Sequence, residues 1–189
     1  GGLSTFLKLL GILEQPQEGS VFINEHNTTQ MCFEEFLGIR MKMGYSFDFG
    51  GLFANRTIHD NLTLPLLYHK LYTPEEASDY VCELAVHFGF ENQQYLRPAM
   101  VSGGLRKLTC VLRAFIMKPQ FAILDDPFTG VGMEASRKLV RMIQERREAG
   151  ELKHLFITSR DDVWPHWLGC DLLHVDKTSI RLEERQAAA

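Results

Sequence analysis

The sequence predicts an α/β fold with a largely parallel central sheet, and three observations support this prediction. Residues 121–124 are apolar throughout and are followed by the acidic pair Asp125 and Asp126. Residues 154–158 form a second short and mostly apolar segment. A helical pattern over residues 134–148 separates the two segments. A strand that is apolar on both faces is typical of a parallel sheet covered by helices, and alternating strands and helices are typical of the α/β class.

The other elements follow from local patterns along the chain. Apolar residues recur at helical spacing over residues 4–13, while Thr73 before Pro74 and Ser102 before two glycines mark helix starts. The predicted elements outside the sheet just described are a helix over 4–13, strands over 21–23 and 44–47, helices over 58–68, 74–88 and 103–117, and a short helix followed by strands over 172–175 and 180–182. Residues 24–43 fit no single pattern.

Length and composition indicate one globular domain with a helical insert. The chain has 189 residues, of which 45% are hydrophobic and 23% charged, and this balance excludes wholesale disorder and a fibrous repeat. Residues 59–117 contain only predicted helices and interrupt the alternation of strands and helices. We therefore predict a core formed by residues 1–58 and 118–189, with a helical subdomain over residues 59–117.

Charge and cysteine content exclude several classes of protein. The formal net charge of −4 argues against a broad basic surface, so no nucleic-acid partner is expected. No apolar run approaches the roughly 18 residues of a membrane span, and the first residues show no signal-peptide pattern. The four cysteines lie far apart, which predicts buried, reduced thiols in a cytosolic protein and neither a disulfide framework nor a zinc site.

The acidic pair is the first candidate for chemistry. Asp125 and Asp126 follow an apolar strand, which places their carboxylates at the carboxyl edge of a parallel sheet, where such sheets bind ligands. In a nucleotide-hydrolysing protein the first acid holds Mg²⁺ through water and the second orients the attacking water. Taken alone, Asp-Asp-Pro is also a common turn and helix start.

Two glycine-containing helix starts are the second candidate. Ser102, Gly103 and Gly104 open a helix, and such a start frees backbone N–H groups that suit a phosphate. Taken alone, the segment also fits an ordinary glycine-rich N-cap. The first five residues, Gly-Gly-Leu-Ser-Thr, match the end of a phosphate loop, G-x-x-x-x-G-K-[ST], except that Leu3 stands in place of the lysine. Taken alone, they also fit a frayed terminus before a helix.

The order of these motifs resembles that of an ABC transporter nucleotide-binding domain. Residues 49–66 (FGGLFANRTIHDNLTLPL), followed by VSGGLRK and DDPFTGV, are most similar to the ATPases of Mla/Mce-type bacterial lipid transporters. The resemblance implies a P-loop NTPase fold with a RecA-like core, ATP and Mg²⁺ as cofactors, and a location on the cytoplasmic face of a membrane. It implies a transmembrane permease subunit and a second ATP-binding subunit as partners. It also implies strands upstream of the phosphate loop, which we expect to be missing from these residues.

The resemblance assigns roles to individual positions. Ser4 matches the Mg²⁺-binding hydroxyl, and Asp125 matches the Walker B acid. The candidate catalytic residues are Asp126, which corresponds to the family's glutamate, and Arg160, which corresponds to its switch histidine. The implied nucleotide-binding residues are Gly1, Gly2, Leu3, Ser4, Thr5, Asp48, Ser102, Gly103 and Gly104, and the implied Mg²⁺ ligands are Ser4, Asp48 and Asp125.

Five positions depart from the family pattern. They are Leu3 for the phosphate-loop lysine, Asp48 for the Q-loop glutamine, Asp126 for the catalytic glutamate, Gly132 for the D-loop aspartate and Arg160 for the switch histidine. A leucine cannot donate the charge-assisted hydrogen bond, worth roughly 1.5–3 kcal/mol, that a lysine gives to phosphate. The shorter Asp126 draws the carboxylate back by about 1.5 Å, and a misplacement of about 1 Å can cost 10²-fold in rate. These departures predict weak ATP binding and little or no hydrolysis.

The signature Ser-Gly-Gly is intact, which changes the functional expectation. Family members work as head-to-tail dimers in which each site pairs one chain's Walker motifs with the other chain's signature. We therefore predict a degenerate subunit, of the lipid-transport type, that completes a partner's site in a heterodimer. Two alternatives stay open: an active transport ATPase that uses Asp126 as its catalytic carboxylate, and a scaffold subunit that binds no nucleotide.

Overall fold

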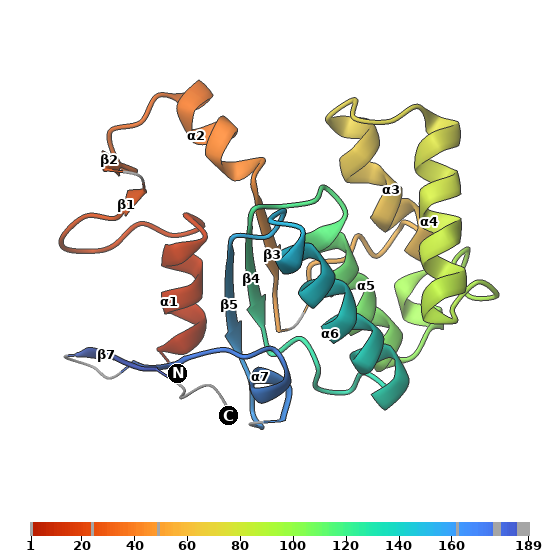
Figure 1. Cartoon of the computed structure of the whole chain (residues 1–189). Helices are drawn as coiled ribbons and strands as arrows, with labels where there is room; N and C mark the ends of the chain where they lie inside the picture. The colour runs from red at the N-terminus through yellow and green to blue at the C-terminus, as the bar shows by residue number, and fades with distance from the viewer. Residues whose placement is uncertain (1, 24, 49, 162, 176–178, 185–189) are drawn as a thin grey trace.

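The computed structural model describes residues 2–23, 25–48, 50–161, 163–175 and 179–184 (Figure 1). The helices are α1 (Leu3–Leu10), α2 (Phe33–Arg40), α3 (Ile58–Tyr68), α4 (Pro74–Phe88), the 3₁₀ helix η1 (Pro98–Met100), α5 (Gly103–Phe115), α6 (Met133–Glu148) and α7 (Val163–Trp167). The strands are β1 (Phe22–Ile23), β2 (His26–Asn27), β3 (Met43–Ser46), β4 (Phe121–Asp125), β5 (His154–Thr158), β6 (Leu172–Val175) and β7 (Ile180–Glu183). Among these residues the predicted elements are found in their predicted order.

The predicted parallel sheet is confirmed. Strands β3, β4 and β5 pair in that order and run parallel, with Ser46 opposite Leu124 and Asp125 opposite Thr158. Strand β4 lies in the middle and is the most buried, as expected for a strand that is apolar on both faces. The carboxyl ends of the three strands therefore meet at one edge. Two small antiparallel pairs, β1 with β2 and β6 with β7, complete the strands of the described residues.

Local capping explains why several helix boundaries match the prediction. Helix α4 begins after Thr73, whose Oγ1 accepts a hydrogen bond from the Glu76 backbone N–H at 3.2 Å, while the Glu76 carboxylate accepts from the Thr73 N–H at 2.8 Å. It ends at Gly89, whose φ of 77° suits the left-handed C-cap. Pro65 lies inside α3 and does not end it. The ambiguous residues 24–43 contain β2 and the short α2, which buries no side chain.

The helices α3, α4 and α5 pack together beside the sheet. Figure 1 shows α3 and α4 next to each other, with α5 between them and the strands. Their apolar faces and β4 share one core, whose most buried large side chains include Ile58, Leu62, Leu66, Val81, Val111, Leu112, Phe115 and Leu124. Helix α5 approaches β3 so closely that a Cβ on Gly44 would lie 2.0 Å from the Ala114 carbonyl oxygen. The division into a core and a helical subdomain over residues 59–117 stays a prediction.

The cysteine prediction is wrong in one respect. No disulfide links the four cysteines, but only Cys110 is buried and Cys32 is exposed. Cys32 lies at the start of α2, a helix with no buried side chain, so nothing covers it in the described structure. None of the helices in the described part of the chain is both long and apolar enough to cross a membrane.

Candidate functional site

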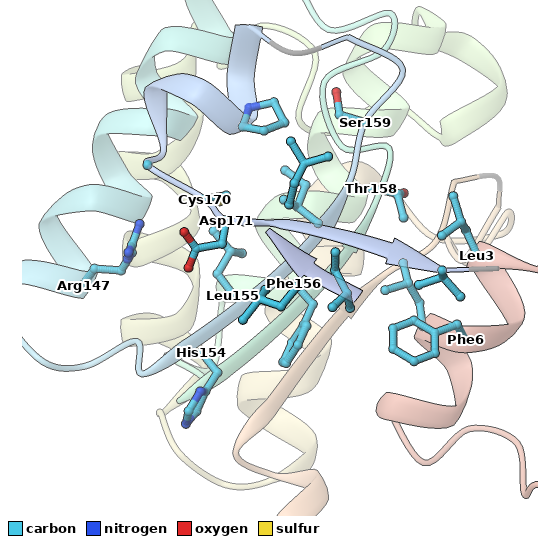
Figure 2. A pocket seen from close by; sticks show the side chains of 18 of the residues that line it. Leu3, Phe6, Arg147, His154, Leu155, Phe156, Thr158, Ser159, Cys170 and Asp171 are labelled. Atoms are coloured by element: carbon cyan, nitrogen blue, oxygen red, sulfur yellow. The ribbon is translucent and has the colours of Figure 1, made fainter. Parts of the chain in front are cut away.

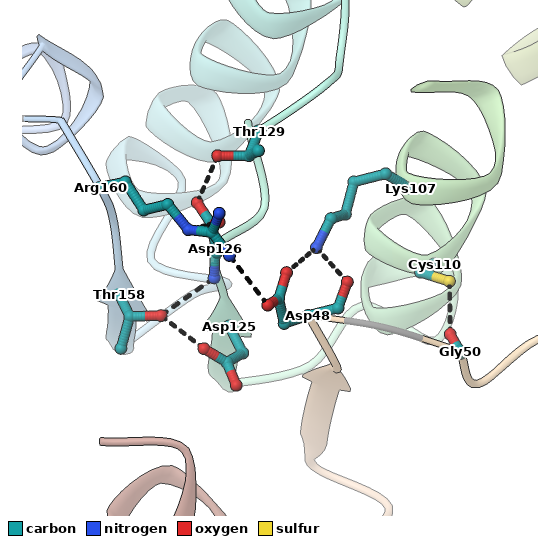
Figure 3. Close-up of polar contacts among 9 residues, drawn as sticks. All are labelled: Asp48, Gly50, Lys107, Cys110, Asp125, Asp126, Thr129, Thr158 and Arg160. Atoms are coloured by element: carbon teal, nitrogen blue, oxygen red, sulfur yellow. Dashed lines mark hydrogen bonds and ion pairs between the residues drawn. The ribbon is translucent and has the colours of Figure 1, made fainter. Parts of the chain in front are cut away.

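The carboxyl edge of the sheet gathers residues from four elements. Asp48 follows β3, Asp125 ends β4, Thr158 ends β5, and Arg160 lies two residues beyond it. Lys107 comes from the second turn of α5 and points at the same place (Figure 3). Side chains that are 112 residues apart along the chain thus come into contact, because parallel strands end at the same edge.

Four charged side chains at this edge form what we call the ion cluster: Asp48, Lys107, Arg160 and Asp126, the residue that follows β4. Lys107 Nζ lies 2.9 Å from Asp48 Oδ1, and Arg160 Nη2 lies 3.3 Å from Asp48 Oδ2. Arg160 Nε lies 2.9 Å from Asp126 Oδ2, as an ion pair without an aligned hydrogen bond. Two carboxylates therefore face two cations, and the four charges neutralise one another.

The arms of the ion cluster differ in exposure, which decides their relative strength. The side chains of Lys107 and Asp48 are 10% and 23% exposed, so their pair is only partly screened by water. The Arg160 side chain is 63% exposed, so its two pairs fall in the weak range of surface salt bridges. We conclude that the Lys107–Asp48 ion pair is stronger than either ion pair of Arg160.

Thr158 holds the acidic pair in place. Its Oγ1 donates to Asp125 Oδ1 at 2.7 Å and accepts from the Asp126 backbone N–H at 3.0 Å. Asp126 has φ of 48°, a left-handed conformation that costs most L-residues about 1–2 kcal/mol and that aspartate tolerates better than glutamate. Thr129 Oγ1 donates to Asp126 Oδ1 at 2.8 Å. Both carboxylates are buried and fixed from several sides.

The pKa of Tyr45 on β3 is raised by burial and by nearby carboxylates. Burial raises its pKa to about 12, and the nearby carboxylates of Asp125 and Glu14 contribute to the same rise. Its hydroxyl is buried and has no hydrogen-bond partner among the described residues. Tyr45 therefore stays protonated at any ordinary pH.

Most of the carboxylate oxygens suggested as magnesium ligands at this edge already contact other groups of the described residues. Both carboxylate oxygens of Asp48 face cationic nitrogens, and Asp125 Oδ1 accepts the Thr158 hydroxyl. Ser4 is exposed at the start of α1 and makes no side-chain hydrogen bond within the described part of the chain. Among the described residues, no three His, Cys, Asp or Glu side chains group around a common point. The roles suggested for Ser4, Asp48 and Asp125 as Mg²⁺ ligands stay predictions, and this arrangement does not favour them.

The start of α1 lies against an apolar groove. Gly1 lies outside the described residues, and Gly2 is the N-cap of α1 without a side-chain cap. Leu3 is 46% exposed, and Thr5 is exposed as well. Leu3 and Phe6 line a groove of about 670 Å³, and Thr158 at the end of β5 lines it close to Leu3 (Figure 2). Leu3, which the resemblance matches to the phosphate-loop lysine, thus lies close to the sheet edge and presents its methyl groups there.

The signature segment lies at the open start of α5. Ser102 Oγ accepts from the Leu105 N–H at 3.1 Å and caps the helix, and both Ser102 and Gly103 are exposed. Gly104 packs on the loop after β4, where a Cβ would lie 2.4 Å from the Gly130 carbonyl oxygen. Gly132, which the resemblance matches to the D-loop aspartate, is exposed at the N-cap of α6.

Sequence reasoning placed Asp48, Asp126 and Arg160 at the site but missed two residues that connect them. Lys107 was part of the quoted VSGGLRK segment, and its signal is a cation on the half-buried face of an amphipathic helix. Thr158 ends a strand beside the acidic pair, and a hydroxyl at that position is the signal for a bridging hydrogen bond.

Comparisons with known proteins place the chain in a family. Residues 1–129 match the model of the ABC transporter family. The chain is 25% identical, over 86% of its length and 47% of the relative, to the methionine import ATP-binding protein MetN of Mannheimia succiniciproducens. It is 31% identical, over 76% of its length and 40% of the relative, to the probable ribonucleotide transport ATP-binding protein mkl of Mycobacterium tuberculosis. The chain thus spans less than half the length of these curated relatives.

A solved structure supports the fold. The ATP-binding cassette MJ0796, in a dimeric post-hydrolysis state bound to ADP and Pi, superposes with a TM-score of 0.85. The alignment covers 99% of this chain and 82% of MJ0796, at 23% sequence identity. Because the family match extends over more than half of the 189 residues and the fold agrees, this chain belongs to the ABC transporter family and has the fold of its ATP-binding domain.

Proposed function

We propose that this chain is an ATP-binding subunit of a membrane ABC transporter that hydrolyses little or no ATP at its own Walker side. The observation that carries the proposal is the ion cluster. The resemblance matches Asp48, Asp126 and Arg160 to the Q-loop, catalytic and switch positions. In the ion cluster these side chains and Lys107 neutralise one another. A site whose carboxylates are already paired gains little from binding a metal ion or from orienting water.

The start of α1 supports the same proposal. Leu3 stands in place of the lysine that the family uses for the β- and γ-phosphates, and it lines the groove with its side chain half exposed. An apolar group next to a polyanion loses the phosphate's hydration without replacing it, which weakens binding. Weak ATP binding at Leu3 and the paired carboxylates of the ion cluster would both lower ATP hydrolysis.

The segment Ser102, Gly103 and Gly104 supports a role in binding the nucleotide of a partner subunit. Ser102 and Gly103 are exposed at a helix start, where backbone N–H groups suit a phosphate. MJ0796 forms a dimer, as its description states. By analogy, this chain would pair with a second ATP-binding subunit, another copy or a different cassette, and present Ser102, Gly103 and Gly104 to the nucleotide of that partner. A transmembrane permease would hold the pair at the cytoplasmic face of the membrane.

The comparisons also bear on the cargo of the proposed transporter. The similarity of residues 49–66 to lipid transport ATPases concerns one stretch of sequence. The relatives with the matches given above are described as methionine import and ribonucleotide transport proteins, so the comparisons lend no support to a lipid cargo. The permease subunit determines the cargo, and isolating it with this chain would identify the substrate class.

Phosphate release by the purified full-length protein with Mg-ATP tests the proposal. We expect release at the background of the assay, with the Asp126→Asn variant indistinguishable from the wild type. Turnover that disappears in Asp126→Asn would instead establish an active ATPase. A calorimetric titration with Mg-ATP separates weak binding from none: no heat and an unchanged melting temperature would establish a scaffold that binds no nucleotide.

A further inference from the structure

One face of α5 holds the loop that follows β3. Lys107, Cys110 and Arg113 are spaced three residues apart and therefore lie along one stripe of the helix. Each donates a hydrogen bond to a backbone carbonyl of the loop: Lys107 Nζ to Asp48, Cys110 Sγ to Gly50 at 3.1 Å, and Arg113 Nη2 to Gly51. Three successive donors on one helix thus satisfy carbonyls that have no strand or helix of their own.

The loop is shaped to receive these donors. Gly50 and Gly51 have φ of 78° and 88°, left-handed conformations that favour glycine and that make a turn at these two residues. Arg113 is half-buried, and desolvation lowers its pKa from the ordinary value. Its Nη1 also lies 3.3 Å from Asn61 Oδ1, so the guanidinium joins the loop to α3 as well.

Asp48 extends this contact to the far side of the site. Its carbonyl and one carboxylate oxygen accept from Lys107, while the other carboxylate oxygen faces Arg160. Arg160 in turn faces Asp126. A continuous path of polar contacts therefore runs from α5 through Asp48 to the loops after β5 and β4 (Figure 3).

We propose that Lys107, Cys110 and Arg113 form a latch that fixes Asp48, Gly50 and Gly51 on α5 and, through Asp48, holds α5 and the loops after β4 and β5 in one arrangement whether or not nucleotide is present. The partly buried Lys107–Asp48 pair is its main contact, and Arg160 is its exposed end. This inference rests on the contacts of α5 and does not depend on the loss of hydrolysis.

Cys110 supplies a direct readout of the latch. Its side chain is 8% exposed and burial raises its pKa, so its thiol reacts slowly while the loop covers it. In a full-length protein carrying Cys32→Ser, Cys82→Ser and Cys170→Ser, the rate of reaction with the disulfide reagent DTNB reports opening of the loop. Loss of one buried charge-assisted hydrogen bond corresponds to about a tenfold rise in that rate.

The variants are Lys107→Gln, Asp48→Asn and the conservative Arg113→Lys, with Lys138→Gln as the matched control. Lys138 forms a surface pair with Glu134 on α6, at 2.8 Å and away from the latch. We expect about a tenfold faster reaction in Lys107→Gln and Asp48→Asn, a smaller rise in Arg113→Lys and no change in Lys138→Gln. We also expect the effects of Asp48→Asn and Lys107→Gln to be less than additive, because both substitutions remove the ion pair between these two side chains.

Two results would overturn the latch. One is an unchanged reaction rate in every latch variant whose circular dichroism and melting temperature show it to be folded. The other is a several-fold faster reaction of the unaltered protein in saturating Mg-ATP, which would show that nucleotide moves the loop. Either result leaves the phosphate-release test of the proposed function unaffected, so the two can fail separately.

Discussion

The ion cluster and the signature segment both involve α5 and differ in what they offer to a ligand. In the ion cluster, charged side chains face one another and both carboxylates, Asp48 and Asp126, are paired with cations. At the start of α5, Ser102 and Gly103 face solvent, and only Gly104 is packed. The comparison teaches that one helix, α5, serves both regions: its first turn stays open, and its next turns hold the loop of the ion cluster in place.

The largest expected effect concerns the approach of α5 to the sheet, on which the ion cluster depends. In Gly44→Ala the new Cβ would meet the Ala114 carbonyl oxygen at 2.0 Å, and backbone cannot move aside as a side chain can. We expect a loss of about 3 kcal/mol or more in the free energy of unfolding, measured by urea denaturation. The control is Gly38→Ala on the exposed α2, where a Cβ has open space and a gain of about 0.5–1 kcal/mol is expected. Equal stability of the two variants would contradict the close approach.

Gly104→Ala applies the same reasoning to the signature side. Its Cβ would meet the Gly130 carbonyl oxygen at 2.4 Å, so the first turn of α5 must shift from the loop after β4. We expect a loss of about 1–3 kcal/mol in urea denaturation. Gly103→Ala is the matched control, because its Cβ lies 3.7 Å from Arg106 Nη2, an ordinary contact. If Gly103→Ala were the more damaging of the two, the packing described for Gly104 would be wrong.

Thr158→Val tests whether Thr158 holds Asp125 and Asp126 in place. Valine keeps the shape but removes the donor to Asp125 and the acceptor of the Asp126 N–H, both of which are buried. We expect a loss of about 1–3 kcal/mol, seen as a lower melting temperature. Thr129→Val removes one contact at an exposed position, and its expected loss is smaller. A melting temperature of Thr158→Val equal to that of the wild type would show that Thr158 does not hold the pair.

Tyr45→Phe has the smallest expected effect near neutral pH. The Tyr45 hydroxyl has no partner among the described residues, so its removal leaves stability unchanged or slightly raised. The folded pKa of about 12 lies above the unfolded value of about 10. Stability from this group is therefore complete below pH 10 and is lost as the pH rises towards 12. Wild-type stability should fall more steeply than that of Tyr45→Phe over this range, and parallel curves would contradict the raised pKa.

The sequence predicted the elements that carry local signals. Thr73 and Ser102 marked helix starts, and the apolar residues 121–124 marked the central strand, because capping and burial on both faces leave a pattern within a few neighbouring residues. Helix α2 was not predicted, because it lacks a buried face and so lacks a periodic apolar pattern.

The ion cluster could not be predicted in the same way. Its residues are far apart along the chain and three of them lie in loops, where charge has no periodicity. The sequence indicated that Asp48 and Arg160 depart from the family pattern, but not that they compensate each other's charge or that Lys107 joins them. Such pairs become visible only once the strand order brings three loops to one edge.

Phosphate release by the assembled transporter, isolated with its membrane subunit and second cassette, tests the central claim most directly. Two substitutions in this chain are compared: Ser102→Arg, which blocks the open start of α5, and Asp126→Asn, which removes a carboxylate that the ion cluster already pairs. The account predicts at least a tenfold loss of release in Ser102→Arg and a change of less than about twofold in Asp126→Asn. A loss in Asp126→Asn with Ser102→Arg unaffected would contradict it.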